Sequence, residues 1–127
     1  MKKIQKGQSL IMMLFFTLIG ITVISSAVFI IITNSKGSAK LQQSVVAYEI
    51  AQSGAENAML QLLRNPAYLG EVMTIGDGTA TIQVSSNSGT FTITSKGQSG
   101  NFIKKVQVIG TYQNYVITFS QIKEIYN

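Results

Sequence analysis

Residues 40–65 read KLQQSVVAYEIAQSGAENAMLQLLRN, and their apolar pattern decides the fold. Larger apolar side chains recur at the spacing of one helix face, at Leu41, Val45, Tyr48, Ala55, Met59 and Leu62. A neighbouring face carries only small residues, at Ala47, Ala51, Gly54 and Ala58. Because small side chains permit close approach of another backbone, we expect a sheet to lie against this second face.

The helix is expected to begin well before this stretch. Leu10 to Ile32 forms an uncharged apolar run of about 23 residues, or roughly 35 Å as a helix, which is enough to cross a bilayer. Only glycines interrupt the helical pattern from Gln8 onward. Since proline disfavours helix in the residue before it, the helix is predicted to end near Asn65 and Pro66.

After Pro66 the apolar period changes from that of a helix to the alternation of strands. The alternating segments are TATIQVSS (79–86), GTFTITS (89–95), KVQVIGTY (105–112) and YVITFSQIKEIY (115–126). Their predicted inward residues are Ala80, Ile82, Val84, Phe91, Ile93, Val106, Val108, Tyr115, Ile117 and Phe119. Turns are predicted at residues 76–78, 87–89, 96–101 and 113–114, and Glu71 to Ile75 is a candidate edge strand.

These patterns predict an α+β fold with a long N-terminal helix packed against a small antiparallel sheet of three to five strands. The expected organisation is a basic segment at 1–7, a hydrophobic membrane helix at 8–35, its amphipathic continuation at 36–65 and a β domain at 66–127. A β domain of about 60 residues buries too little surface to be stable alone, so we expect it to need the helix.

Composition excludes several kinds of chemistry. The chain of 127 residues has no cysteine and no histidine, which rules out thiol catalysis, disulfides, zinc fingers and imidazole acid–base catalysis. We therefore expect no enzyme activity, no cofactor and no metal. The net charge of +5 includes three lysines within the first seven residues, so the remainder is an ordinary mixed surface.

The junction between those lysines and the apolar run contains a glycine that a membrane helix does not need. Gly7 costs about 1 kcal/mol relative to alanine inside a helix. A basic stub, Gly7, a polar pair and a long apolar helix together resemble the type IV pilin and pseudopilin family. The resemblance implies cleavage by a prepilin peptidase between Gly7 and Gln8 on the cytoplasmic face, and an N-methylated terminus at Gln8.

Two further stretches, VAYEIAQSGAENAMLQLLRNP (46–66) and FTITSKGQSGNFIKKVQV (91–108), resemble minor pilins that initiate or cap a filament. Most family members carry glutamate at the fifth mature position, which is Met12 here. A unit ion pair at 4 Å is worth about 4 kcal/mol at an effective dielectric of 20, so its loss favours an initiating or tip subunit over a major one. The implied partners are other pilin subunits, the peptidase and, before assembly, the membrane.

The resemblance also implies a location. The clustered lysines before the apolar run place the N-terminus in the cytoplasm and the C-terminus outside. The precursor would lie in the cytoplasmic membrane and the processed protein in a surface or periplasmic filament. Bacterial and archaeal origins both fit the junction, and the filament's use in adhesion, motility, secretion or DNA uptake stays open.

Other functions also fit the sequence. The chain fits a single-pass, signal-anchored surface protein with a small binding domain, or a secretory precursor cleaved after Ala27. It also fits a DNA-capturing pilin in which Lys96, Lys104 and Lys105 contact phosphates. Bases would then stack on the aromatic rings of Phe102, Tyr112 or Tyr115. For Asp77, a tight turn is favoured over a calcium site shared with Glu71, and the KGQSG segment (96–100) is interpreted as a flexible connection.

Overall fold

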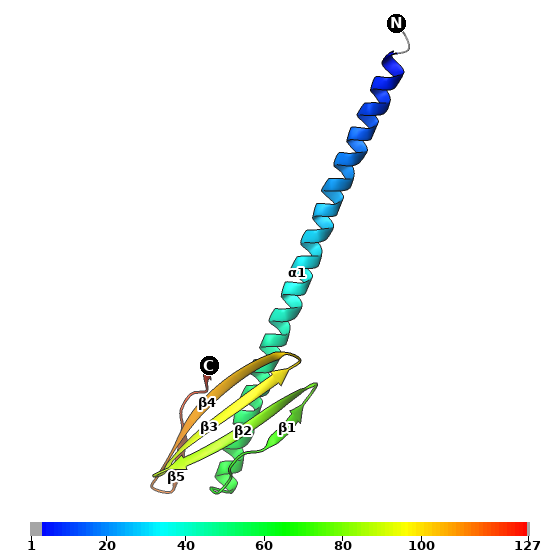
Figure 1. The fold of residues 1–127 in the computed structure, drawn as a ribbon. Coiled ribbons are helices and arrows are strands. Elements are labelled where there is room, and N and C mark those ends of the chain that lie inside the picture. Colours follow the sequence, from blue (N-terminus) through cyan, green and yellow to red (C-terminus); the bar gives the residue numbers. More distant parts are fainter. Residues whose placement is uncertain (1–3, 127) are drawn as a thin grey trace. The chain divides into compact units, whose positions relative to one another are not determined.

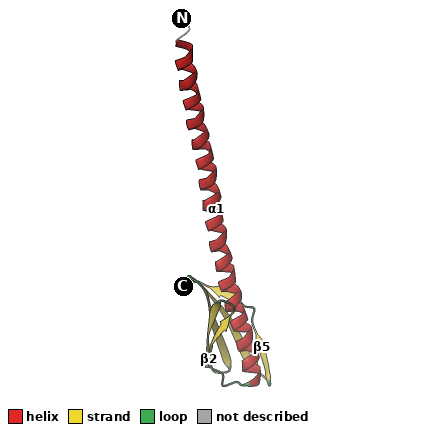
Figure 2. Cartoon of the chain, turned by 90° about the vertical axis from the view of Figure 1, so that its right-hand side faces the viewer, coloured by secondary structure: helices red, strands yellow, loops and turns green. Residues whose placement is uncertain are grey.

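A computed structural model describes the backbone of residues 4–126 and side chains from Gly7 onward. It confirms the α+β class, with a single helix followed by a small antiparallel sheet (Figures 1 and 2). Helix α1 spans Ile4–Arg64 and ends directly before Asn65 and Pro66, as predicted. The strands are β1 (Val72–Ile75), β2 (Gly78–Asn87), β3 (Thr90–Ser99), β4 (Phe102–Gln113), β5 (Val116–Phe119) and β6 (Lys123–Ile125).

The first five strands follow one another across the sheet in chain order, β1-β2-β3-β4-β5, and each neighbouring pair is antiparallel. The predicted edge strand is β1. The predicted run from Tyr115 to Tyr126 is not one strand, because it divides into β5 and β6, which both pair with β4. The division occurs at Ser120, whose hydroxyl accepts a hydrogen bond from the Ile109 amide at 3.0 Å.

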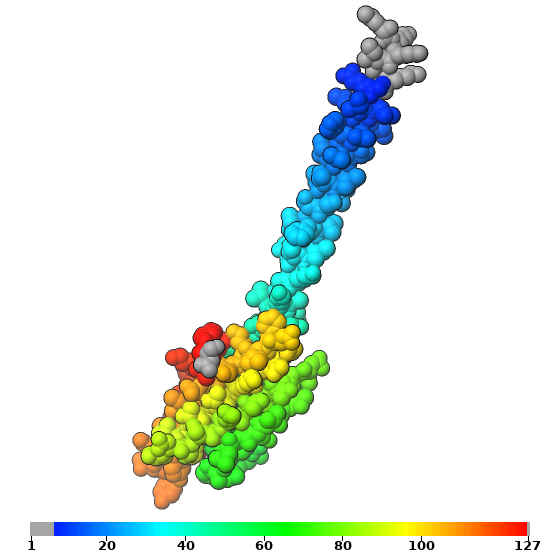
Figure 3. Space-filling model, in the orientation of Figure 1, coloured from blue at the N-terminus to red at the C-terminus, as the bar shows by residue number. Residues whose placement is uncertain are grey.

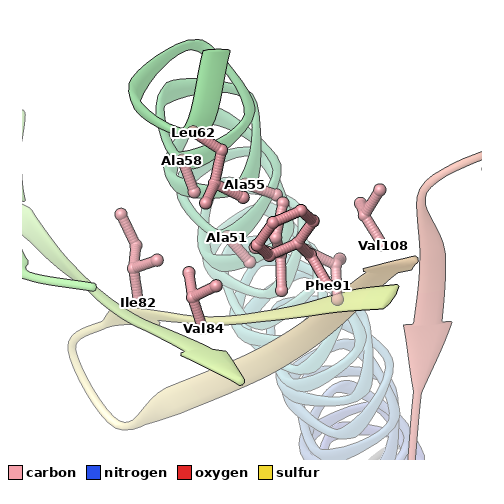
Figure 4. Close-up of a cluster of buried hydrophobic side chains, with 10 residues drawn as sticks. Ala51, Ala55, Ala58, Leu62, Ile82, Val84, Phe91 and Val108 are labelled. Carbon is pink, nitrogen blue, oxygen red and sulfur yellow. The ribbon is translucent and has the colours of Figure 1, made fainter. Parts of the chain in front are cut away.

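Two compact units make up the chain, Met1–Ala39 and Lys40–Asn127. The second unit holds the last part of α1 together with the whole sheet, and its core lies between them. Ten buried residues form this core (Figure 4): Ala51, Ala55, Ala58, Leu62, Ile82, Val84, Phe91, Ile93, Val106 and Val108. The sheet residues in this set are all positions that the alternating pattern placed inward.

The small-residue face of α1 covers the middle of the sheet, together with Ala55 and Leu62 from the larger apolar face. Ala47, Ala51 and Ala58 are completely buried, whereas Leu41 and Val45 are 71% and 55% exposed. The prediction that a sheet lies against the small residues is therefore confirmed. Tyr115, predicted to point inward, instead lies in the turn between β4 and β5 and is 93% exposed.

The closest approach between α1 and the sheet occurs at a glycine of β3. A methyl group on Gly97 would overlap the carbonyl oxygen of Ala47 and the amide nitrogen of Ala51. The interpretation of residues 96–100 as a flexible connection is therefore wrong, because β3 continues to Ser99 and only Gly100 and Asn101 form the turn. Glycine is needed here because backbone meets backbone.

Gly54 of α1 also lies very close to the sheet. A methyl group there would overlap the Ser95 hydroxyl and lie 3.0 Å from the Ala80 methyl. Ser95 is fully buried, and its hydroxyl finds no hydrogen-bond partner among the described residues. A small side chain at this position fits the narrow space between strand and helix, even though its polar atom is left unsatisfied.

We predict that Gly97→Ala destabilises the second unit by about 3 kcal/mol, because the new methyl group would force two backbones apart. Gln98→Ala, which changes an exposed neighbour on the same strand, should alter the free energy of unfolding by less than about 0.5 kcal/mol. Chemical denaturation of the full chain in detergent, followed by tyrosine fluorescence, measures both. Equal stability of the two variants would show that the close contact does not hold the unit together.

Candidate functional site

The most distinctive surface of the protein is the apolar part of α1 in the first unit. Between Leu10 and Ile32 the large hydrophobic side chains are 47% to 74% exposed, on every side of the helix. Figure 3 shows this part in blue and cyan, with its side chains on the surface. A helix that is hydrophobic all round requires lipid or other helices around it, and this one is long and apolar enough to cross a membrane.

Polar side chains in this segment are satisfied by the helix itself. Thr17, Thr22, Ser25 and Ser26 each donate a hydrogen bond of 2.8 Å to a backbone carbonyl three or four residues earlier. Thr33 does the same with the carbonyls of Phe29 and Ile30. These hydroxyls therefore need no water, which makes the segment compatible with a hydrocarbon environment.

The residues of the predicted processing site lie at the start of this helix. Gly7 has open space around it, since a methyl group there would meet no atom within 4 Å. Gln8 is exposed, and Met12 is 61% exposed. Packing within the described residues thus gives no reason for glycine at position 7. The leader residues Lys2 and Lys3 lie outside the described residues, and so does the side chain of Lys6.

The three lysines considered for DNA binding line one pocket together with Glu124 and Tyr126, although the strand alternation puts Lys104 on the other face of the sheet from Lys96 and Lys105. Lys96 and Lys105 are direct partners across β3 and β4, and they alternate with the inward-facing core residues. Lys104 directly precedes Lys105 on β4, so strand alternation directs it to the opposite face of the sheet. Its ammonium lies 2.6 Å from a Glu124 carboxylate oxygen. That hydrogen bond raises the pKa of Lys104 and lowers that of Glu124. One lysine is therefore already paired.

The aromatic residues proposed to stack on bases are also dispersed. Phe102 begins β4, whereas Tyr112 is near its other end, about 23 Å from Lys105 along the strand. A ring does lie near Lys104, because the centroid of Tyr126 is 5.6 Å from its ammonium nitrogen. The Tyr126 hydroxyl donates to Glu124 at 3.1 Å, so this group ties the short strand β6 to β4.

The two acids considered for calcium lie at opposite ends of β1. Glu71 accepts hydrogen bonds from the Asn57 amide at 2.8 Å and from the Tyr68 hydroxyl at 3.0 Å. Burial of the Tyr68 hydroxyl and its hydrogen bond to Glu71 raise the pKa of Tyr68 to about 12. Asp77 lies in the tight turn between the paired residues Ile75 and Gly78, which confirms the interpretation as a turn. Glu71 thus anchors the segment after α1 to the helix.

Two structural features were missed from the sequence. One is the buried position of Gly97 on β3. The other is the position of Tyr115 in a turn, because the turn predicted at 113–114 lies one residue later, at Asn114 and Tyr115, which both have positive φ angles. A signal for the second was available, because a two-residue turn starting with asparagine between alternating segments is typical of a β-hairpin.

No protein-family profile, curated protein or solved structure matches this chain.

Proposed function

We propose that this protein is a minor pilin or pseudopilin, a structural subunit without enzymatic activity that helps to initiate or cap a type IV pilus-like filament. The observation that carries the proposal is the helix segment from Leu10 to Ile32, which exposes hydrophobic side chains on every side. Such a surface suits lipid before assembly and a bundle of equivalent helices afterwards. Other pilin subunits are then the partners of this segment.

The second unit suits the part of such a subunit that stays outside the membrane. Its sheet has a polar outer side and packs its apolar side on residues 47–62 of α1. The core cluster is made of hydrophobic side chains, with the hydroxyl of Ser95 also buried, and the described residues contain no group of three or more potential metal-ligating side chains. A compact and chemically simple unit of this kind fits a structural role.

Gly7 supports the proposed processing step. It lies in α1, where glycine is unfavourable, and no neighbouring atom requires its small size. Recognition by a prepilin peptidase, with cleavage before Gln8, supplies a reason for the residue. The lysines that precede it favour retention of that end in the cytoplasm.

Placement at the start or tip of a filament follows from Met12. A thioether cannot pair with the amino terminus of a neighbouring subunit as a glutamate does, so insertion beneath an existing subunit loses an interaction of about 4 kcal/mol. The amine of Gln8 is still available to an acid on a subunit that arrives later. A later subunit can therefore be added beneath this protein more readily than this protein can be added beneath an existing subunit.

A lone membrane anchor with a binding domain has the same apolar helix but needs no processing. DNA capture is less favoured, because Lys104, one of the three lysines that line the pocket, is paired with Glu124, so Lys96 and Lys105 alone remain to contact phosphates there. Two phosphate contacts give a small electrostatic contribution to DNA affinity.

We predict that Gly7→Leu blocks processing and leaves membrane insertion intact, because only the peptidase needs a glycine there. Gly37→Leu is the matched control, since Gly37 is another helical glycine at which an added methyl group would meet no atom within 4 Å. In cells with a prepilin peptidase, intact mass should show wild type and Gly37→Leu beginning at Gln8 and Gly7→Leu uncleaved. A mature chain beginning at Val28, or uncleaved wild type in filaments, would contradict the proposal.

We further predict that Met12→Glu moves the protein from filament ends into the shaft, because the new carboxylate can pair with the amine of the subunit above. Met12→Gln is the control, since it is polar but uncharged. Labelled protein is located on filaments by electron microscopy. Wild-type protein spread along the shaft at the abundance of a major subunit would show that the missing glutamate does not restrict placement.

A further inference from the structure

The turn between β4 and β5 has an unusual residue at its second position. Gln113 pairs with Val116, which leaves Asn114 and Tyr115 as a two-residue turn with φ angles of 50° and 63°. Turns with two positive φ angles strongly favour glycine at the second position, commonly after asparagine. Here a tyrosine takes the place of that glycine.

Packing does not compensate for this conformation. Bulky residues are strained in the left-handed region, and such residues cluster at functional sites. The Tyr115 side chain is 93% exposed, so it contributes almost nothing to the core. Stability of the fold alone would favour glycine at position 115. A ligand that contacts the tyrosine ring would explain why tyrosine is present instead.

A second turn lies beside the first at this end of the sheet. The Tyr112 amide donates a hydrogen bond of 2.8 Å to the carbonyl of Gly89, which belongs to the turn between β2 and β3. In Figure 1 the ends of β2 and β5 meet at the lower left. We call the exposed residues of both turns the hairpin-tip surface: Asn87, Ser88, Tyr112, Asn114, Tyr115 and Val116.

The chemistry of the hairpin-tip surface is uncharged. No charged residue occurs from Ser85 to Ser95 or from Val106 to Ile122, so both turns and the parts of the strands next to them lack ionisable acids and bases other than tyrosine. Amides and hydroxyls there can both donate and accept hydrogen bonds. Exposed tyrosine rings add rigid apolar faces with polar edges, which bind at a low cost in conformational entropy.

We propose that the hairpin-tip surface binds a neutral polysaccharide, with the ring of Tyr115 stacked on the apolar face of a sugar. Sugars present both C–H faces and hydroxyl groups, which match the aromatic ring and the neighbouring amide and hydroxyl groups. Acidic polymers match poorly, because no cation is present in either turn. This inference does not depend on the proposed filament role, since it rests only on the second unit.

Binding of the full chain in detergent to immobilised dextran, mannan and laminarin tests the proposal, with alginate as the acidic counterpart. Wild type should bind at least one of the three neutral polymers and should not bind alginate more strongly. Tyr115→Ala should weaken that binding about tenfold, as expected for loss of one central aromatic contact. Tyr115→Phe should retain it. Tyr126→Ala, which removes an exposed tyrosine elsewhere, should leave it unchanged.

Tyr115→Gly separates a binding role from a structural one. Glycine relieves the strain, so amide hydrogen exchange in β5 should become slower while polysaccharide binding falls as it does in Tyr115→Ala. Faster exchange in Tyr115→Gly would show that the tyrosine stabilises the hairpin, and this would overturn the proposal. The proposal is also overturned if none of the three neutral polymers binds, if alginate alone binds, or if only a protein partner occupies the surface.

Discussion

The contact between the backbone of β3 at Gly97 and the backbone of α1 at Ala47 and Ala51 is the constraint on which the second unit depends. Helix and sheet approach so closely here that even a methyl group on Gly97 would overlap the helix backbone. Gly54 and Ser95 continue the same close approach along the helix. The larger core residues, such as Leu62 and Phe91, are buried in the same cluster.

One helix therefore carries two different surfaces. From Leu10 to Ile32 its large hydrophobic side chains are exposed on all sides, whereas from Ala47 to Leu62 it buries mostly small residues against the sheet. The first surface favours lipid or other helices, and the second completes the core of the second unit. This division gives the proposed function its physical basis, because a filament subunit must leave the membrane without unfolding the part that stays outside.

Local periodicity was enough to predict much of the fold. Alternation identified the inward residues of β2, β3 and β4, and the Asn65-Pro66 pair located the end of α1. The role of Gly97 was not predictable from periodicity. A glycine in a turn and a glycine that allows a helix to pack closely against a strand cannot be distinguished by sequence pattern alone. Tyr115 was misplaced because alternation was extended through a turn that lacks its usual glycine.

The candidate sites were predicted unevenly. Lys104 and Lys105 are consecutive in a predicted strand, so alternation already required them to face opposite sides of the sheet. The partner of Lys104, Glu124, became apparent only when β6 was found beside β4. For Gly7, the sequence did not explain why glycine occurs in a helix. The structure adds that no packing contact requires glycine there.

The central claim is that the sheet folds only with the helix segment that covers it. The most direct measurement compares the thermal unfolding of a chain beginning at Lys40 with that of a chain beginning at Pro66. The longer chain should melt in one cooperative transition, and the shorter one should be unfolded or aggregated, because its apolar face has no cover. Cooperative melting of the chain that begins at Pro66 would contradict the account.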